Sequence, residues 1–265
     1  PAHAEIDAIV REVVNAVPAY DFVADDGIGH QLWVIREVET INRLESLFST
    51  DVPATYVADG HHRTAAAAGV VSERARANPA HTGREEYNYF LAVHFPADQL
   101  TIIDYKRVVK DLNGLSDWDF LDRLEAAFKI EKKGKEIHKT DGLHKFGLYL
   151  SGSWFSLTAR DGTYDDDDPI GQLDVTVLSE HVLAPLLDIT DLRKSKRIDF
   201  VGGIRGLKEL ERRVDSGEMK AAFALYPVSM EQLMEIADSD NIMPPKTTWF
   251  EPKLRSGLVI HKLED

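Results

Sequence analysis

Residues 54–68, ATYVADGHHRTAAAA, constrain the fold of this chain more than any other stretch. Thr55–Val57 is a short β-branched and aromatic run, which predicts a buried strand. Gly60 breaks this run, because glycine adopts backbone angles that its neighbours avoid. From Arg63 the sequence is alanine-rich and typical of a helix, until Asn78 precedes a proline. The stretch therefore predicts a strand that passes through a tight turn into a helix.

The start of this predicted helix is a candidate phosphate site. The first amides of a helix have no partner within it and carry the positive end of its dipole. Arg63 offers a fork of donors that matches a phosphate, and histidines can move protons near neutral pH. Asp59 could hold Mg²⁺ or orient a histidine. The residues that we predict to take part are, for phosphate binding, Gly60, His61, Arg63 and Thr64 and, for catalysis, His62 and Asp59.

The same residues have a simpler explanation, in which polar side chains only satisfy backbone groups at the helix start. Zinc is not expected here, because His61 and His62 would point about 100° apart on a helix and so suit one metal ion poorly. The chain also has no cysteine, which excludes disulfides and thiolate metal sites. We therefore predict no protein-bound metal cluster.

Gly202–Gly206 is a second glycine turn between a predicted strand and a predicted helix. It differs from both the dinucleotide fingerprint and the Walker loop. The basic cluster at residues 193–197 lies just upstream, so Gly203 and Arg205 are candidates for binding a second anion. The alternative is a tight turn beside a solvated basic face.

The loop at residues 245–253 combines cations, hydroxyl groups and an acid, and it makes Lys246 a further candidate phosphate ligand. The alternative is that Trp249 and Phe250 simply hold this loop against the core.

The overall charge limits the classes of partner. Lys and Arg number 31 and Asp and Glu 45, so the net charge is −14 over 265 residues. This balance argues against broad nucleic-acid binding, which requires basic residues to neutralise phosphates. No apolar run approaches the roughly 18 residues expected of a spanning helix, which argues against a membrane role. A cytoplasmic protein is expected.

Strand-like and helix-like segments alternate irregularly along the chain, with hairpins as well as crossovers. This order predicts an α/β or α+β fold with a mixed sheet. The lysine-rich residues 129–145 are expected to form a turn-prone boundary between residues 1–130 and residues 131–265. The other segments that we expect to be regular are the paired strands Tyr89–Phe95 and Leu100–Ile103, a helix over Leu173–Leu187, and helices capped by Ser116 and Ser229.

The run Tyr56–Arg63, YVADGHHR, resembles the signature of the domain-of-unknown-function family numbered 1015. Other stretches that match the family pattern are Tyr20–Phe22, Asp26–Gly27, His30–Trp33, Leu178–Pro185, Lys196–Gly203 and Pro244–Pro252. The signature is similar to the phosphate corner of the ParB/sulfiredoxin-like fold, which the archaeal free-serine kinases share. This likeness implies that residues 59–64 hold a phosphate or a nucleotide tail, and it places the ParB-like part within residues 1–130.

The resemblance also implies a function. It points to a phosphotransferase that acts on a small molecule, with ATP or ADP and Mg²⁺ as cofactors and a nucleotide or phosphorylated small molecule as ligand. The alternative is a nucleotide-gated, protein-binding module of the ParB type. Members of the family are longer than this chain, which begins at Pro1 without an initiator methionine, so we expect a fragment that lacks an N-terminal region and the acid expected to serve as catalytic base.

Overall fold

The computed structural model describes residues 2–263, which pack as two compact units. The N-terminal unit runs to Leu100 and also takes in the described residues from Leu254 onward. The C-terminal unit comprises Thr101–Lys253. The boundary predicted after residue 130 differs from this division, because Ile130 lies inside a strand of the C-terminal unit. The ParB-like assignment of the N-terminal part stays a prediction.

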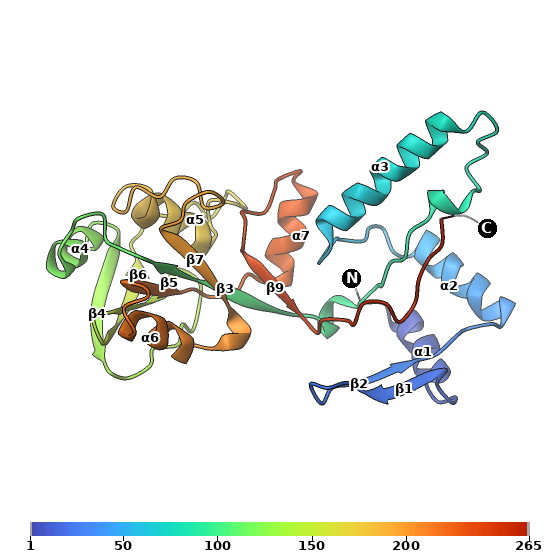
Figure 1. Ribbon diagram of the computed structural model, residues 1–265, viewed down its shortest axis with the longest axis horizontal. Coiled ribbons are helices and arrows are strands. Elements are labelled where there is room, and N and C mark those ends of the chain that lie inside the picture. The colour runs from blue at the N-terminus through green and yellow to red at the C-terminus, as the bar shows by residue number, and fades with distance from the viewer. Residues whose placement is uncertain (1, 264–265) are drawn as a thin grey trace. The chain divides into compact units, whose positions relative to one another are not determined.

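The N-terminal unit consists of helices and one hairpin. Its elements are α1 (Ala4–Val13), β1 (Tyr20–Val23), β2 (Gly29–Leu32), α2 (Val38–Thr50), α3 (His61–Ala77) and two 3₁₀ turns, Glu86–Asn88 and Ala97–Gln99 (Figure 1). Strands β1 and β2 pair antiparallel, with Tyr20 opposite Leu32. The turn between them uses Gly27 at a φ of +79°, a left-handed conformation that favours glycine.

Two strands predicted in this unit are wrong. Neither Thr55–Val57 nor Tyr89–Phe95 pairs with another strand in the part of the chain that the structure describes. Val57 is 42% exposed and Phe90 is 53% exposed. β-Branched and aromatic residues favour strands because their side chains fit a pleated surface. Such a sequence therefore forms no strand where no neighbouring strand is available.

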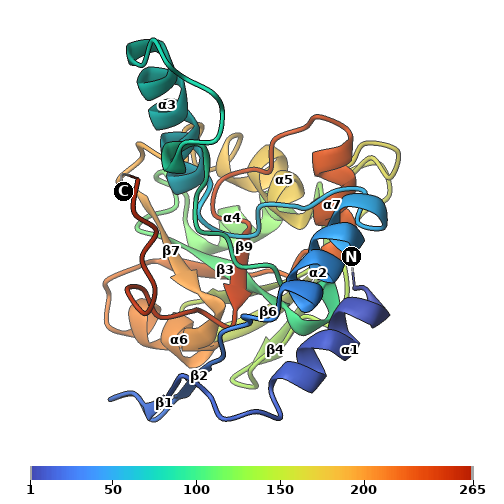
Figure 2. The same ribbon diagram turned by 90° about the vertical axis from the view of Figure 1, so that its right-hand side faces the viewer.

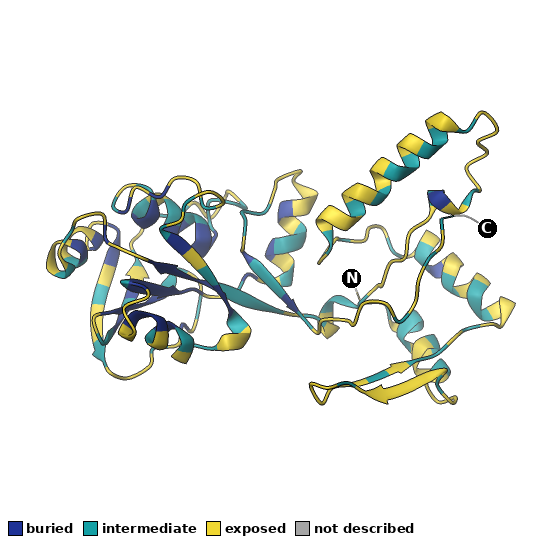
Figure 3. Cartoon of the chain, in the orientation of Figure 1, coloured by how far each residue is buried: buried dark blue, intermediate teal, exposed yellow. Residues whose placement is uncertain are grey.

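The side chains of the N-terminal unit are largely open to solvent. Of its described residues only Leu47 and Tyr87 are buried, and none of the residues of α3 is (Figure 3). Helix α3 can be followed along its length in both views of the ribbon (Figures 1 and 2). Its helical state therefore depends mainly on the high propensity of its alanines rather than on burial.

The C-terminal unit is built on one antiparallel sheet. Its strands are β3 (Thr101–Val109), β4 (Phe128–Gly134), β5 (Lys145–Leu150), β6 (Ser153–Ala159), β7 (Ile198–Gly202), β8 (Ala221–Ala224) and β9 (Thr248–Glu251), in the order β4-β6-β5-β8-β3-β7, with β9 paired to the first half of β3. The predicted combination of helices and strands is confirmed. Every pairing among the described strands is antiparallel, so the sheet is not mixed and the fold is of the α+β kind.

The lysine-rich residues 129–145, expected to form a boundary, in fact begin with most of β4. Phe128 is buried and Ile130 half-buried, so the apolar side chains recur every second residue as a strand requires. The intervening lysines lie at an edge of the sheet. Lysine is common at such edges, because its charge prevents unwanted pairing.

Helices cover both faces of this sheet. They are α4 (Asp117–Leu124), α5 (Asp174–Leu178), α6 (Lys208–Asp215) and α7 (Met230–Asp238). Alternate side chains of β8 pack into two separate groups of buried apolar residues. Phe223 packs with residues of α4, α5 and α7, and Ala222 packs with residues of α6. Figure 1 accordingly shows α5 and α6 on opposite sides of the sheet.

Local capping signals in the sequence are confirmed. The Ser116 side chain accepts from the amide of Asp119 at the start of α4. Ser229 and Gln232 form a capping box at the start of α7. The helix predicted over Leu173–Leu187 starts at Asp174 and changes to a π-helix over Ser179–Leu183.

The described residues include no helix that combines the length and the apolar character needed to cross a bilayer.

Candidate functional site

The start of α3 brings together six of the predicted site residues, Asp59–Thr64. Gly60 is the residue before the helix and has a φ of +86°, the left-handed conformation that favours glycine. Its carbonyl accepts from the amide of Thr64 at 2.9 Å, which closes the first helical turn. The side chain of Asp59 accepts from the amide of Gly60 at 2.7 Å. This sharp turn places the next three amides at an exposed helix end.

Those amides are available to an anion. The first amides of a helix have no partner within the helix, and within residues 2–263 no side chain caps this one. His61, His62 and Arg63 are all exposed, and Thr64 is half-buried. The helix start therefore presents backbone donors, two imidazoles and a guanidinium to solvent.

Arg63 folds back over the turn. A β-carbon added to Gly60 would lie 3.1 Å from its Nη2 atom and 3.2 Å from its Nε atom, so the guanidinium rests on the glycine. Among the described residues Arg63 has no hydrogen bond or ion pair, so its donors remain available. A fork of donors next to uncapped helix amides is a site suited to a phosphate group.

The three other predicted ligands, Gly203, Arg205 and Lys246, belong to the C-terminal unit. Gly203 and Arg205 form the ends of a 3₁₀ turn after β7, and the side chain of Arg205 is exposed. A β-carbon on Gly203 would lie 1.9 Å from Cγ2 of Ile103 and 2.8 Å from the carbonyl oxygen of Asp104. Close packing against β3 therefore accounts for Gly203 without a ligand.

Lys246 lies at one end of a row in which two lysines flank a pair of aromatic rings. Its Nζ atom is 5.5 Å from the ring centroid of Tyr105, and that ring meets Trp249 edge-on at 5.5 Å. The Nζ atom of Lys253 lies 5.5 Å from the ring of Trp249. The sequence predicted Lys246 as a phosphate ligand but gave no sign of Tyr105, because Tyr105 comes from β3 and lies more than a hundred positions away.

A buried charge that the sequence did not reveal, the guanidinium of Arg107, is hydrogen-bonded to Lys246 of this row. Arg107 is 1% exposed, and burial lowers its pKa to about 10 against the opposing effect of Asp104 and Asp174. Its Nη2 atom donates to the carbonyl of Lys246 at 3.0 Å, which fixes the loop before β9. Strand β3 thus places a guanidinium in the buried interior of the C-terminal unit.

Asp174, at the first position of α5, is the acid that faces this interior. Burial raises its pKa to about 6, although the amides of His144 and Tyr226 donate to it at 2.7 and 3.2 Å. A pKa so far above the usual range is typical of functional sites and also of buried structural acids. Here the hydrogen bonds from the backbone amides of His144 and Tyr226 hold the loops that precede β5 and follow β8. Asp174 is therefore assigned a structural role.

The residues present do not assemble a metal site on their own. Within the described part of the chain, no group of three or more His, Asp or Glu side chains comes together as a metal site would require. Asp59, the expected Mg²⁺ ligand, already accepts from Gly60. No catalytic step is therefore assigned to a metal.

Comparison with known families settles the affiliation of the chain. A family model described as "Protein of unknown function (DUF1015)" matches residues 1–176. The chain belongs to this family. The predicted resemblance is thereby confirmed, and this DUF1015 member carries the signature residues at the start of α3. A comparison with curated protein sequences finds no significant match.

Several solved structures are similar to this DUF1015 protein. A free serine kinase in complex with AMP has 15% identity and a TM-score of 0.43, with 82% of this chain and 81% of that one covered. A mutant free serine kinase in complex with ADP has 16% identity and a TM-score of 0.40, with the same coverage. A conserved hypothetical protein from Pyrococcus furiosus has 18% identity and a TM-score of 0.41, with 82% and 84% covered. At such identities and scores, no functional residue is transferred from these structures.

Proposed function

We propose that this protein binds the phosphates of a nucleotide or phosphorylated small molecule at the start of α3 and transfers a phosphoryl group to a small acceptor such as serine. One observation carries the proposal. The guanidinium of Arg63 rests on Gly60 at an uncapped helix start and has no partner among the described residues. An unpaired guanidinium beside uncapped amides is electrostatically matched to a phosphate.

Phosphoryl transfer needs mainly positioning and charge neutralisation, so such a corner could contribute much of what the reaction requires. The amides of His61 and His62 and the side chain of Arg63 hold the phosphate oxygens. His62, exposed beside them, accepts the proton of the acceptor hydroxyl as that oxygen bonds to phosphorus and the bond from phosphorus to the oxygen of the phosphate donor breaks. Asp59 orients the turn through its bond to the amide of Gly60.

Calorimetric titration of ADP, ATP, pyrophosphate and phosphoserine into wild type and Arg63→Ala tests this binding. We expect at least one ligand to bind wild type and to bind the variant about tenfold or more weakly, since a charged hydrogen bond contributes about 1.5–3 kcal/mol. Arg76→Ala is the matched control, because Arg76 is an exposed arginine in the last turn of the same helix. Wild type that binds none of the four, or binds no better than Arg63→Ala, contradicts the proposal.

A second candidate function is a nucleotide-gated module that binds a protein. It is favoured by a groove of about 280 Å³ in the N-terminal unit, lined by apolar side chains that include Val70, Phe90 and Leu91. Exposed apolar side chains gathered at one place are typical of protein-binding surfaces. Phosphorus NMR of a mixture with ATP and serine separates the two functions: phosphoserine supports the transferase, and slow release of inorganic phosphate alone supports the module.

A further inference from the structure

A groove of about 430 Å³ in the C-terminal unit lies outside every site described so far. One wall is a single face of α4. Trp118, Leu121, Asp122 and Glu125 follow the i, i+3, i+4, i+7 spacing that aligns side chains along a helix. Trp118 is 71% exposed, although tryptophan is usually well buried. An exposed tryptophan at a groove is the kind of residue that dominates binding energy at interfaces.

The opposite wall belongs to the edge of the sheet. Ile130 and Lys132 come from β4, and Phe155, which pairs directly with Lys132, comes from β6. In the described part of the unit, β4 pairs with β6 alone and ends the strand order. Half of the backbone donors and acceptors of an edge strand point away from its partner and can pair with another chain.

This edge is regular enough to act as a template. Five successive residues, Phe128 to Lys132, stand in unbroken register with β6, and the register shifts only between Lys132 and Gly134. The bulge and the lysines limit indiscriminate pairing, so a strand that pairs here must match the charges of the groove.

Those charges lie on opposite walls. Lys132 lies 6.0 Å from the ring of Phe155, and among the described residues it has no ion pair. Asp122 and Glu125 likewise have no cationic partner within residues 2–263. The groove therefore presents an ammonium on the strand side and two carboxylates on the helix side of an apolar floor.

We propose that this groove binds an extended peptide segment of a partner protein, which adds to β4 as a further strand. Alternate side chains of a strand point to the same face, so residues two positions apart enter the groove together. A large apolar side chain of the peptide packs between Trp118 and Ile130. An acidic side chain two positions away pairs with Lys132, and a basic side chain on the same face pairs with Asp122. Main-chain hydrogen bonds supply affinity in this mode of recognition, and the side-chain positions supply specificity. The inference is independent of phosphate binding at α3.

Selection of a phage-displayed library of random seven-residue peptides on the whole protein tests the proposal. We expect enriched sequences with an apolar and an acidic residue two positions apart. Binding of the corresponding synthetic peptide should shift the tryptophan fluorescence of wild type but not that of Trp118→Ala. Trp118→Ala should weaken binding about tenfold, as the loss of an aromatic anchor does. Ile204→Ala is the matched control, because Ile204 is 64% exposed in the turn after β7. No enrichment over the Trp118→Ala protein, or enrichment of a helical spacing, overturns the proposal.

Two further measurements on the selected peptide separate strand addition from other contacts. Methylation of the peptide nitrogens that face β4 should abolish binding, because it removes the main-chain donors. The Lys132→Glu protein should bind the original peptide more weakly than wild type does. It should bind tightly a peptide in which lysine replaces the acidic residue. Binding that tolerates methylation on both edges of the peptide, or a Lys132→Glu protein without this reversal, contradicts strand addition.

Discussion

The guanidinium of Arg63 lies against Gly60, with its Nη2 atom 3.1 Å from the position that a β-carbon on this glycine would occupy. Gly60 has a left-handed conformation, and the exposed Arg63 side chain lies against it at the helix start. Glycine at this position therefore has two roles: it accepts the φ of +86° and it leaves room for the arginine.

Gly60→Ala should impair both roles. The left-handed conformation costs other residues about 1–2 kcal/mol, and the added methyl group would crowd the guanidinium, which must shift by a few tenths of an ångström. We expect a lower melting temperature and weaker phosphate binding in calorimetry. Gly69→Ala in the middle of α3 is the control, since nothing lies within 4 Å of its added β-carbon and the helix should gain about 1 kcal/mol. If the two variants bind phosphate equally, the turn does not position Arg63.

Local signals in the sequence predicted much of this fold. Ser116 and Ser229 marked helix starts because capping depends on three or four neighbouring residues. The turn and helix start that hold residues 59–64 were predicted in the same way, because these residues are contiguous.

The errors came from contacts between distant parts of the chain. Thr55–Val57 has the composition of a strand but no partner to pair with, whereas β4 is rich in lysine and pairs along its length. Arg107 and Asp174 lie 67 positions apart, so no window of sequence shows that one interior holds both. The row formed by Tyr105 and Lys246 likewise exists only after β9 pairs with β3.

Gly203→Ala should destabilise the C-terminal unit. The added methyl group would overlap Cγ2 of Ile103 and press on the carbonyl of Asp104, and overpacking of this kind costs about 1–3 kcal/mol. Urea unfolding should show a lower midpoint. Gly142→Ala, in a loop with nothing within 4 Å of the new β-carbon, is expected to leave the midpoint nearly unchanged. An unaffected Gly203→Ala protein would show that the turn after β7 does not approach β3 as closely as described.

Asp174 should make stability fall as the pH rises between about 4 and 6. Burial raises its pKa from 3.8 to about 6, so in this range the folded protein keeps a proton that the unfolded chain releases. Two pKa units correspond to about 3 kcal/mol, lost by the time the pH exceeds the folded-state pKa. Asp174→Asn should flatten this part of the curve of unfolding free energy against pH. Asp166→Asn, in an exposed loop, should leave the slope intact. A slope that persists in Asp174→Asn assigns the proton uptake to another group.

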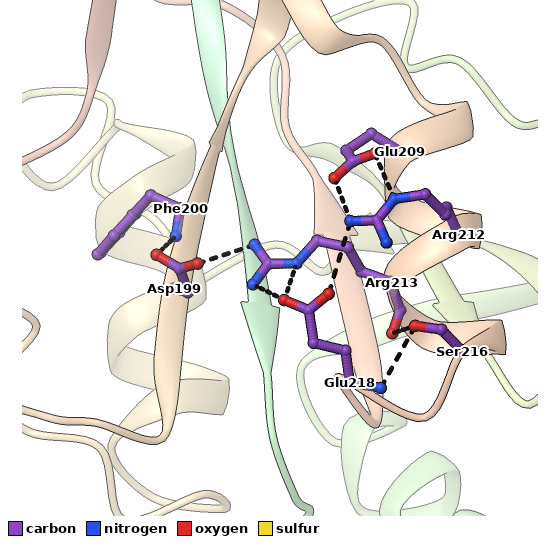
Figure 4. A network of polar contacts seen from close by, with 7 residues as sticks. All are labelled: Asp199, Phe200, Glu209, Arg212, Arg213, Ser216 and Glu218. Atoms are coloured by element: carbon purple, nitrogen blue, oxygen red, sulfur yellow. Dashed lines mark hydrogen bonds and ion pairs between the residues drawn. The ribbon is translucent and has the colours of Figure 1, made fainter.

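The neighbouring arginines Arg212 and Arg213 of α6 should contribute very differently to stability (Figure 4). The side chain of Arg213 is 10% exposed and joins α6 to Asp199 of β7 at 2.8 Å, and its Nε atom also donates to Glu218 at 2.8 Å. Arg212 is 57% exposed; it pairs with Glu209 within its own helix at 2.7 Å and with Glu218 at 3.5 Å.

Arg213→Ala leaves two carboxylates without their main partner and opens the contact between α6 and the sheet. We expect it to lower the free energy of unfolding by about 2 kcal/mol, the order of a charged, partly buried hydrogen-bond pair. Arg212→Ala should cost less than about 0.5 kcal/mol, because an exposed side chain forms its ion pairs with Glu209 and Glu218, and such pairs contribute little. Chemical denaturation of both variants in low and high salt checks this, since only the smaller effect should vanish as salt screens exposed charges. Equal losses in the two variants would mean that burial of Arg213 does not decide its contribution.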